Sequence, residues 1–178
     1  CGGNHADLTH EYAAVTKEMG DYARFFGKTV LREVDESEFY ASLGQLRKSV
    51  SDRALLRAMH FFGDNARVPK QAEALKQHDI ETFRQLMNES GRSSFTLLQN
   101  VCPTDASERG LALALALSER MLAGKGAWRV HGGGFAGTIL ALVPLGDMAG
   151  YQAQMEKVFG QGCCYRFAVR PVGGVQIG

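Results

Sequence analysis

This sequence lacks the features that mark several large classes of protein. Its 178 residues carry a formal net charge of only +1, so no general electrostatic attraction to nucleic acid or to an anionic membrane is expected. The longest apolar stretch, residues 135–145, is far shorter than the roughly 20 residues that a membrane-spanning helix needs. The sequence therefore predicts neither nucleic acid nor a membrane as a partner.

Cysteine and histidine are too few and too scattered to predict a disulfide framework or a metal site. Only Cys163 and Cys164 are close in sequence, and a disulfide between neighbouring residues is strained. No CxxC or HxxxH spacing occurs, so a zinc site would have to gather ligands from distant segments. We therefore predict no metal ligands and a reduced, cytoplasmic protein.

What the sequence does contain is an average globular composition with helical patterning over its first two thirds. Hydrophobic residues make up 45% and charged residues 22%, which excludes wholesale disorder. Apolar residues recur at intervals of three and four, and this spacing predicts five helices, over residues 11–26, 35–50, 51–75, 79–98 and 104–124. The predicted N-caps are Asp35 for the second helix, Ser51 or Asp52 for the third and Asp79 for the fourth. Residues 111–117 alternate like a strand, but alanine and leucine are strong helix formers, so a helix is predicted there. Pro69 predicts a kink or break in the third helix, because proline cannot donate to the helical ladder.

The pattern changes after Gly124. Two strands, residues 128–130 and 138–143, are predicted on either side of a glycine-rich loop. A helix over residues 147–159 and a last strand over residues 163–169 follow, the strand being predicted from alternating apolar residues. We therefore expect one α+β domain, with helices packed on one face of a small antiparallel sheet.

The glycine-rich loop, residues 131–137, formally matches the dinucleotide-binding pattern GxGxxG. That pattern requires a helix after the loop, whereas here a strand follows, so a dinucleotide site is excluded. Two explanations of three consecutive glycines stay open. The first is that the glycines form a roomy hairpin turn, and the second is that they let the backbone approach an anion or a sugar closely. Either way, we predict a loop between antiparallel strands with at least one glycine at positive φ.

Three segments together resemble the GHMP small-molecule kinases in their galactokinase form. Residues 128–143 (WRVHGGGFAGTILALV) resemble the third motif of that family, and residues 5–12 (HADLTHEY) resemble its segment with a histidine and a glutamate-tyrosine pair. Residues 75–103 resemble its helix followed by a cysteine-proline turn. The resemblance implies a ferredoxin-like GHMP kinase C-terminal domain over residues 13–178, with residues 1–12 as the remnant of a junction to a missing N-terminal domain.

The resemblance also implies which chemistry lies outside this chain. The family's phosphate-binding motif with its serines, and the aspartate and arginine that face the sugar hydroxyl, have no counterpart here. We therefore expect no catalytic residue in this chain and no activity from it alone. The full-length parent is expected to convert galactose to galactose 1-phosphate with ATP and Mg²⁺, neither of which this chain is expected to bind by itself.

The resemblance implies candidate binding residues at the positions of this sequence that match the family's motifs. Tyr12 matches the family's sugar-contacting tyrosine, although a core aromatic on the first helix would show the same pattern. Beside the loop, Arg129 could meet phosphate or pair with a nearby acid, and His131 could touch ligand or be structural. The loop glycines that would line the cleft are Gly132, Gly133, Gly134 and Gly137.

The chain departs from the family in places that leave its substrate open. Residues 13–17 (AAVTK) follow the tyrosine, where the family usually has an asparagine and a pair of arginines. His131 stands where the family commonly has a threonine, and Ala136 where it has a glycine. A GHMP kinase for another small alcohol, or a non-catalytic ferredoxin-like binding module, therefore remains an alternative. The expected partners are the missing N-terminal domain and, through the surface exposed by its absence, a second copy of this chain.

Overall fold

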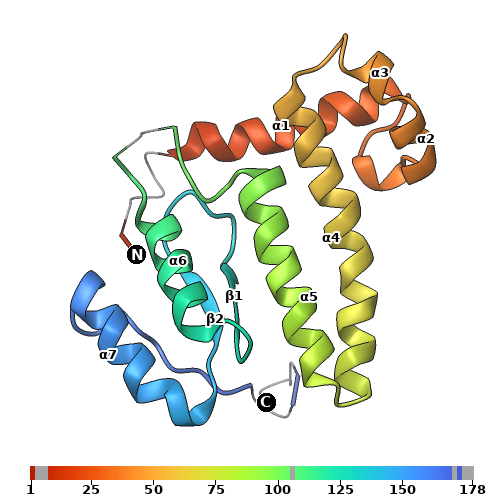
Figure 1. Cartoon of the computed structure of the whole chain (residues 1–178). Helices are drawn as coiled ribbons and strands as arrows, with labels where there is room; N and C mark the ends of the chain where they lie inside the picture. Colours follow the sequence, from red (N-terminus) through yellow and green to blue (C-terminus); the bar gives the residue numbers. More distant parts are fainter. Residues whose placement is uncertain (3–7, 105–106, 170–171, 174–178) are drawn as a thin grey trace, which may run out of the picture.

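Helices make up most of this protein, whose computed structural model describes residues 1–2, 8–104, 107–169 and 172–173 (Figure 1). Two of them, α4 (Asp52–Lys76) and α5 (Ile80–Ser93), form a long antiparallel hairpin. One end of this hairpin packs against α1 (Thr9–Phe25), and α5 also contacts a small sheet. The remaining short elements are η2 (Leu31–Glu33), α2 (Glu36–Ala41), α3 (Leu43–Leu46) and η4 (Leu145–Asp147).

A first hydrophobic core joins the N-terminal helices. Tyr22 of α1, Phe39 of α2, Leu46 of α3 and Ala58 of α4 are completely buried in it. The predicted N-caps of this region are confirmed, because the Asp35 carboxylate accepts from the Glu38 amide and the Ser51 hydroxyl from the Ala54 amide. The single helix predicted over residues 35–50 is instead two short helices that meet at Ser42.

The break expected at Pro69 does not form, and α4 continues past it to Lys76. Proline has no amide hydrogen, so the Asn65 carbonyl lacks the hydrogen bond that it would otherwise accept from residue 69. Both Pro69 and Asn65 are exposed, so water can satisfy that carbonyl. Packing of α4 against α5 then holds the helix through the missing bond.

Helix α5 begins at a capping residue and ends in a π-helical segment. The Asp79 carboxylate caps α5 by accepting from the Thr82 amide at 2.9 Å, as the sequence predicts. At its other end α5 continues as a π-helical segment, η3 (Ser94–Leu98), whose wider turn stops at Gln99 in the left-handed conformation (φ 58°). The next residue, Asn100, is therefore redirected toward the sheet.

The sheet is a two-stranded antiparallel hairpin in the described part of the chain. Strand β1 (Ala127–Val130) pairs with β2 (Ile139–Leu142), with Val130 opposite Ile139. Helices α6 (Gly110–Leu122) and α7 (Met148–Phe159) cover one face of the hairpin, and α5 lies along the outer edge of β1 (Figure 1). The predicted α+β fold is confirmed, including the helix rather than strand over residues 111–117.

The last strand predicted over residues 163–169 is not formed. Gly160 and Gly162 turn the chain with positive φ after α7, and residues 163–169 have no regular structure. Tyr165, Phe167 and Val169 expose 75%, 84% and 100% of their surface. Alternation produces a strand only where a sheet edge pairs with it and a core buries one face. No helix among the described residues is both long and apolar enough to cross a bilayer.

Candidate functional site

The glycine loop joins β1 to β2 and has the backbone that the sequence predicts. The His131 amide donates to the Thr138 carbonyl at 3.0 Å and extends the strand pairing by one residue. Beyond that bond, Gly132, Gly134 and Gly137 all have positive φ, at 69°, 81° and 91°. The prediction of a hairpin loop with left-handed glycines is therefore confirmed, and no helix begins at Phe135.

Two of the glycines are needed because other groups approach the backbone closely. A Cβ atom on Gly133 would lie 2.7 Å from Cε1 of Tyr12, and one on Gly134 would lie 2.1 Å from the carbonyl oxygen of Asn100. Around Gly132, by contrast, a Cβ would meet nothing within 4 Å. The loop is thus a packed structure over Gly133 and Gly134 rather than a roomy turn.

Tyr12, predicted to face the sugar, lies against this loop although 122 residues separate the two. Its hydroxyl donates to the Gly134 carbonyl at 2.7 Å, and its ring meets that of Phe135 edge to face at 5.4 Å. Burial raises the pKa of Tyr12, which keeps the phenol protonated as a donor. Tyr12 is half-buried, so it is a contact of the loop and not a residue of the main core.

The start of α1 is fixed by a buried carboxylate whose partner could not be predicted from the sequence. Glu11 is 5% exposed and accepts from both the amide and the hydroxyl of Thr104, at 3.0 and 2.5 Å. Burial alone would raise the pKa of Glu11, but the two hydrogen bonds from Thr104, together with the charges of His10 and Arg53, outweigh burial and leave the pKa below its usual value. The bonds tie α1 to the turn after Cys102 and so help to position Tyr12.

Asn100 is the second residue that sequence reasoning missed. It is 2% exposed, its side-chain amide donates to the Gly133 carbonyl at 3.0 Å, and its own carbonyl accepts from the Phe135 amide at 2.5 Å. Its position directly after a helix, in the stretch Gln99-Asn100 before Cys102-Pro103, marks a turn but gives no sign of the partner loop.

Arg129 and His131, the two candidate residues beside the loop, have different surroundings. Arg129 donates from Nη1 to the Ser90 hydroxyl at 2.7 Å, and Ser90 in turn donates to Asp64 on α4. Its guanidinium is therefore engaged between α5 and α4, and contact with a phosphate remains a prediction. The side chain of His131 is exposed, so a role in contacting ligand also remains a prediction.

The loop offers donors to an anion or a hydroxyl group. Among the described residues, no acceptor is hydrogen-bonded to the amides of Gly132, Gly133 and Gly134. Successive free amides in a left-handed backbone suit an anionic or hydroxyl oxygen. The described residues hold no cluster of three carboxylate, cysteine or histidine side chains that could bind a metal ion.

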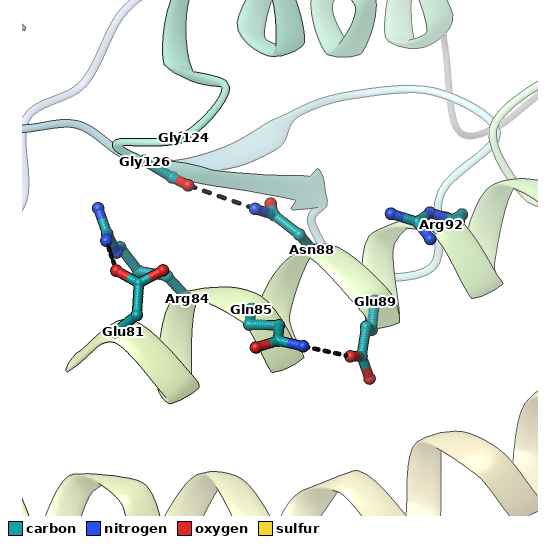
Figure 2. A pocket seen from close by; sticks show the side chains of 8 residues that line it. All are labelled: Glu81, Arg84, Gln85, Asn88, Glu89, Arg92, Gly124 and Gly126. Atoms are coloured by element: carbon teal, nitrogen blue, oxygen red, sulfur yellow. Dashed lines mark hydrogen bonds and ion pairs between the residues drawn. The ribbon is translucent and has the colours of Figure 1, made fainter. Parts of the chain in front are cut away.

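A polar pocket of about 340 Å³ lies at the other end of β1, before the strand begins (Figure 2). Its polar side chains mostly bond one another or the turn: Asn88 donates to the Gly126 carbonyl, and Arg84 contacts Glu81 and the Lys125 carbonyl. None of the predicted site residues lines it. The glycine loop with Tyr12 is therefore the better candidate site.

This combination of fold and loop defines a class. A mostly helical α+β domain, with a glycine loop between two antiparallel strands and a tyrosine from the first helix against it, is consistent with the C-terminal domain of a GHMP kinase. Within that class the chain is similar to galactokinases, which confirms the resemblance predicted from its motifs. No protein-family model matches the chain.

Curated relatives support this similarity over most of the chain. The sequence is 31% identical over 140 residues to a galactokinase of Glaesserella parasuis serovar 5 (strain SH0165). The aligned residues are 79% of this chain and 35% of that protein. The sequence is 32% identical over 144 residues to a galactokinase of Actinobacillus pleuropneumoniae serotype 5b (strain L20), covering 81% and 36%. The chain thus spans about a third of the length of these relatives.

Proposed function

We propose that this chain is the C-terminal domain of an ATP-dependent sugar kinase that converts galactose to galactose 1-phosphate. The observation that carries the proposal is the pairing of Tyr12 with a glycine loop whose amides at Gly132, Gly133 and Gly134 face no described acceptor. A phosphoryl-transfer site needs groups that position a hydroxyl and stabilise phosphate charge. Tyr12 and the loop amides can supply positioning and hydrogen bonds but no proton acceptor for the sugar hydroxyl.

The remaining chemistry is assigned to an N-terminal domain of the same polypeptide. ATP and Mg²⁺ would be held chiefly there, and the loop of this chain would close the cleft from the other side. In this proposal residues 13–178 form the C-terminal domain and residues 1–12 the junction, in a cytoplasmic enzyme. Residues 3–7 of that junction lie outside the described residues, whereas the Gly2 carbonyl accepts from the Gly137 amide at 3.1 Å.

An ADP-release assay with galactose tests the proposal on this chain and on the longer protein that contains it. We expect turnover by the longer protein and none by this chain, because the phosphate-binding motif is absent here. N-acetylgalactosamine and other hexoses, assayed in parallel, test the substrate. Phosphorylation of only another alcohol would replace galactose in the proposal.

The contrary outcomes are equally clear. Robust turnover by this chain alone would contradict the proposal that the catalytic groups lie in a separate N-terminal domain. A longer protein without a serine- and glycine-rich phosphate motif, and without kinase activity, would instead favour the non-catalytic binding module.

A further inference from the structure

The backbone of the glycine loop is strained at a residue that is not glycine. Phe135 has φ of 59°, a left-handed conformation that is unusual for a bulky side chain, and it is 4% exposed. Such conformations persist only where the surroundings hold them, and they concentrate at functional sites. Something must therefore hold residues 133–135 in this shape.

We infer that Asn100 is the positioning residue that sets the shape of the glycine loop for ligand binding, an inference that rests on the proposed function. Asn100 holds the loop at two points. Its Nδ2 donates to the Gly133 carbonyl at 3.0 Å, and its backbone carbonyl accepts from the strained Phe135 amide at 2.5 Å. Between these points, the absence of a Cβ on Gly134 is what lets Asn100 approach.

These bonds decide where the loop amides point. In a trans peptide the carbonyl and the following amide point in opposite directions. Because the Gly133 carbonyl points to Asn100, the Gly134 amide points away from it. Likewise the Gly134 carbonyl points to the Tyr12 hydroxyl and the Phe135 amide to Asn100. Asn100 and Tyr12 thus orient two successive peptide planes at the buried residues Gly134 and Phe135. They thereby fix the backbone beside the exposed Gly132 and Gly133, whose amides have no acceptor among the described residues.

Asn100 is itself held from the helical side of the molecule. The left-handed Gln99 donates from its amide to the Ser94 carbonyl at 2.9 Å, which closes the π-helical segment before it. Arg57, 1% exposed, donates from Nε to the Leu98 carbonyl at 3.2 Å and from Nη1 to Glu18 at 2.9 Å. A rigid support of this kind is what a positioning residue needs.

Only the donor half of the Asn100 amide is used. Its Oδ1 is buried and has no hydrogen-bond partner in the described structure, whereas Nδ2 binds the loop. Replacement by aspartate keeps the size and shape but places an oxygen against the Gly133 carbonyl, so that two acceptors face each other. Asn100→Asp is therefore a sharp test of the donor.

The experiment compares Asn100→Asp with Val101→Ala, in both this chain and the longer protein. Val101 is the next residue, is 2% exposed, and packs in the core between α6 and β1 without bonding the loop, so its truncation controls for lost stability. Amide exchange at Phe135 is measured in this chain, and kcat and KM for galactose and ATP are measured in the longer protein.

We expect Asn100→Asp to reduce protection of the Phe135 amide at least tenfold relative to Val101→Ala, with the exchange of the β1 and β2 amides unchanged. We also expect kcat/KM to fall at least tenfold below that of the control. Should Asn100→Asp be too unstable to purify, Asn100→Ser, whose hydroxyl cannot reach as far, replaces it with the same expectation.

Equal kcat/KM for the Asn100 variant and the control would overturn the inference. If the wild-type longer protein phosphorylates no sugar, the proposed function fails, and the functional part of this inference fails with it. The exchange experiment then still reports whether Asn100 holds the loop. Failure of the proposed function and failure of the loop contact are therefore distinguishable.

Discussion

Two hydrogen-bonded clusters lie at β1 and differ in the kind of group that they hold. At the end of the strand, the loop cluster (Tyr12, Asn100, Gly133, Gly134 and Phe135) consists of bonds to backbone atoms. Beside the strand, the interhelix cluster (His60, Asp64, Ser90, Ser93 and Arg129) consists of bonds between side chains of α4, α5 and β1.

The difference predicts different consequences of mutation. Bonds to backbone atoms define the path of a loop, so a change there alters the shape of the site. Bonds between side chains join elements that already have regular backbones, so a change there costs stability while the elements keep their form. Mutations that separate loop shape from stability can therefore test this comparison.

The largest effect is expected for Gly134→Ala in the loop cluster. The new Cβ would lie 2.1 Å from the Asn100 carbonyl, at a residue with φ of 81°. Since neither backbone can move without breaking the hydrogen bonds of the loop, we expect a loss of about 3 kcal/mol or more in the free energy of unfolding. Urea denaturation measures it.

Gly132→Ala is the matched control for this prediction. That position has φ of 69° but open space around its Cβ, so only left-handed strain of about 1–2 kcal/mol is expected. Similar losses for both substitutions would show that Asn100 does not press against the loop.

An intermediate effect is expected for Ser90→Ala in the interhelix cluster. The Ser90 hydroxyl is buried, donates to Asp64 and accepts from Arg129, so its removal leaves both charged groups short of a partner. We expect a loss of about 1–3 kcal/mol. Amide exchange at Phe135 should follow global stability only. Faster exchange of the Phe135 amide than the loss of global stability explains would show that the interhelix cluster also holds the loop, and would contradict the comparison.

Ser93→Ala provides the comparison for this prediction. Within the described part of the chain, the Ser93 hydroxyl is hydrogen-bonded only to Nδ1 of the His60 ring, at 2.9 Å. Its removal should therefore cost less than the removal of Ser90, which serves two charged groups.

The smallest effect is a pH dependence caused by His60. Burial lowers the pKa of His60; Asp64 opposes this shift, while Arg129 and Arg67 add to it. The unfolded chain then binds the proton more readily than the folded one, so the free energy of unfolding should fall as pH drops below the ordinary pKa of about 6.5. For a single proton the slope cannot exceed about 1.4 kcal/mol per pH unit.

Chemical denaturation at pH 7.5 and at pH 5.5 measures this slope. The variant His60→Gln should show a shallower slope than the wild type between these values, because the titrating group is gone. An unchanged slope in His60→Gln would assign the pH dependence to other groups.

Much of the fold follows from local sequence. The helical face of α1, the caps Asp35, Ser51 and Asp79, and the helix over residues 111–117 depend on neighbours within a few positions, and all were predicted. The hairpin around the glycine loop was likewise predicted, because the strands and the turn signal are adjacent in sequence.

The errors arise where a local pattern depends on a distant partner. Of the kink or break predicted at Pro69, the break does not form, because α5 packs against α4 and Asn65, whose carbonyl loses its partner, is an exposed residue. Residues 163–169 alternate like a strand, yet Tyr165, Phe167 and Val169 remain exposed because no neighbouring edge pairs with them in the described structure.

By itself, the sequence determined most of the helices and their caps, the hairpin and the position of the glycine loop, together with the resemblance to galactokinases. Only the tertiary structure decided which groups hold that loop. Tyr12 reaches Gly134 across 122 residues, and Asn100 reaches Gly133 across 33. The physical reason is that periodicity and capping report interactions within a few residues, whereas a hydrogen bond between distant segments exists only once packing has brought donor and acceptor to about 3 Å.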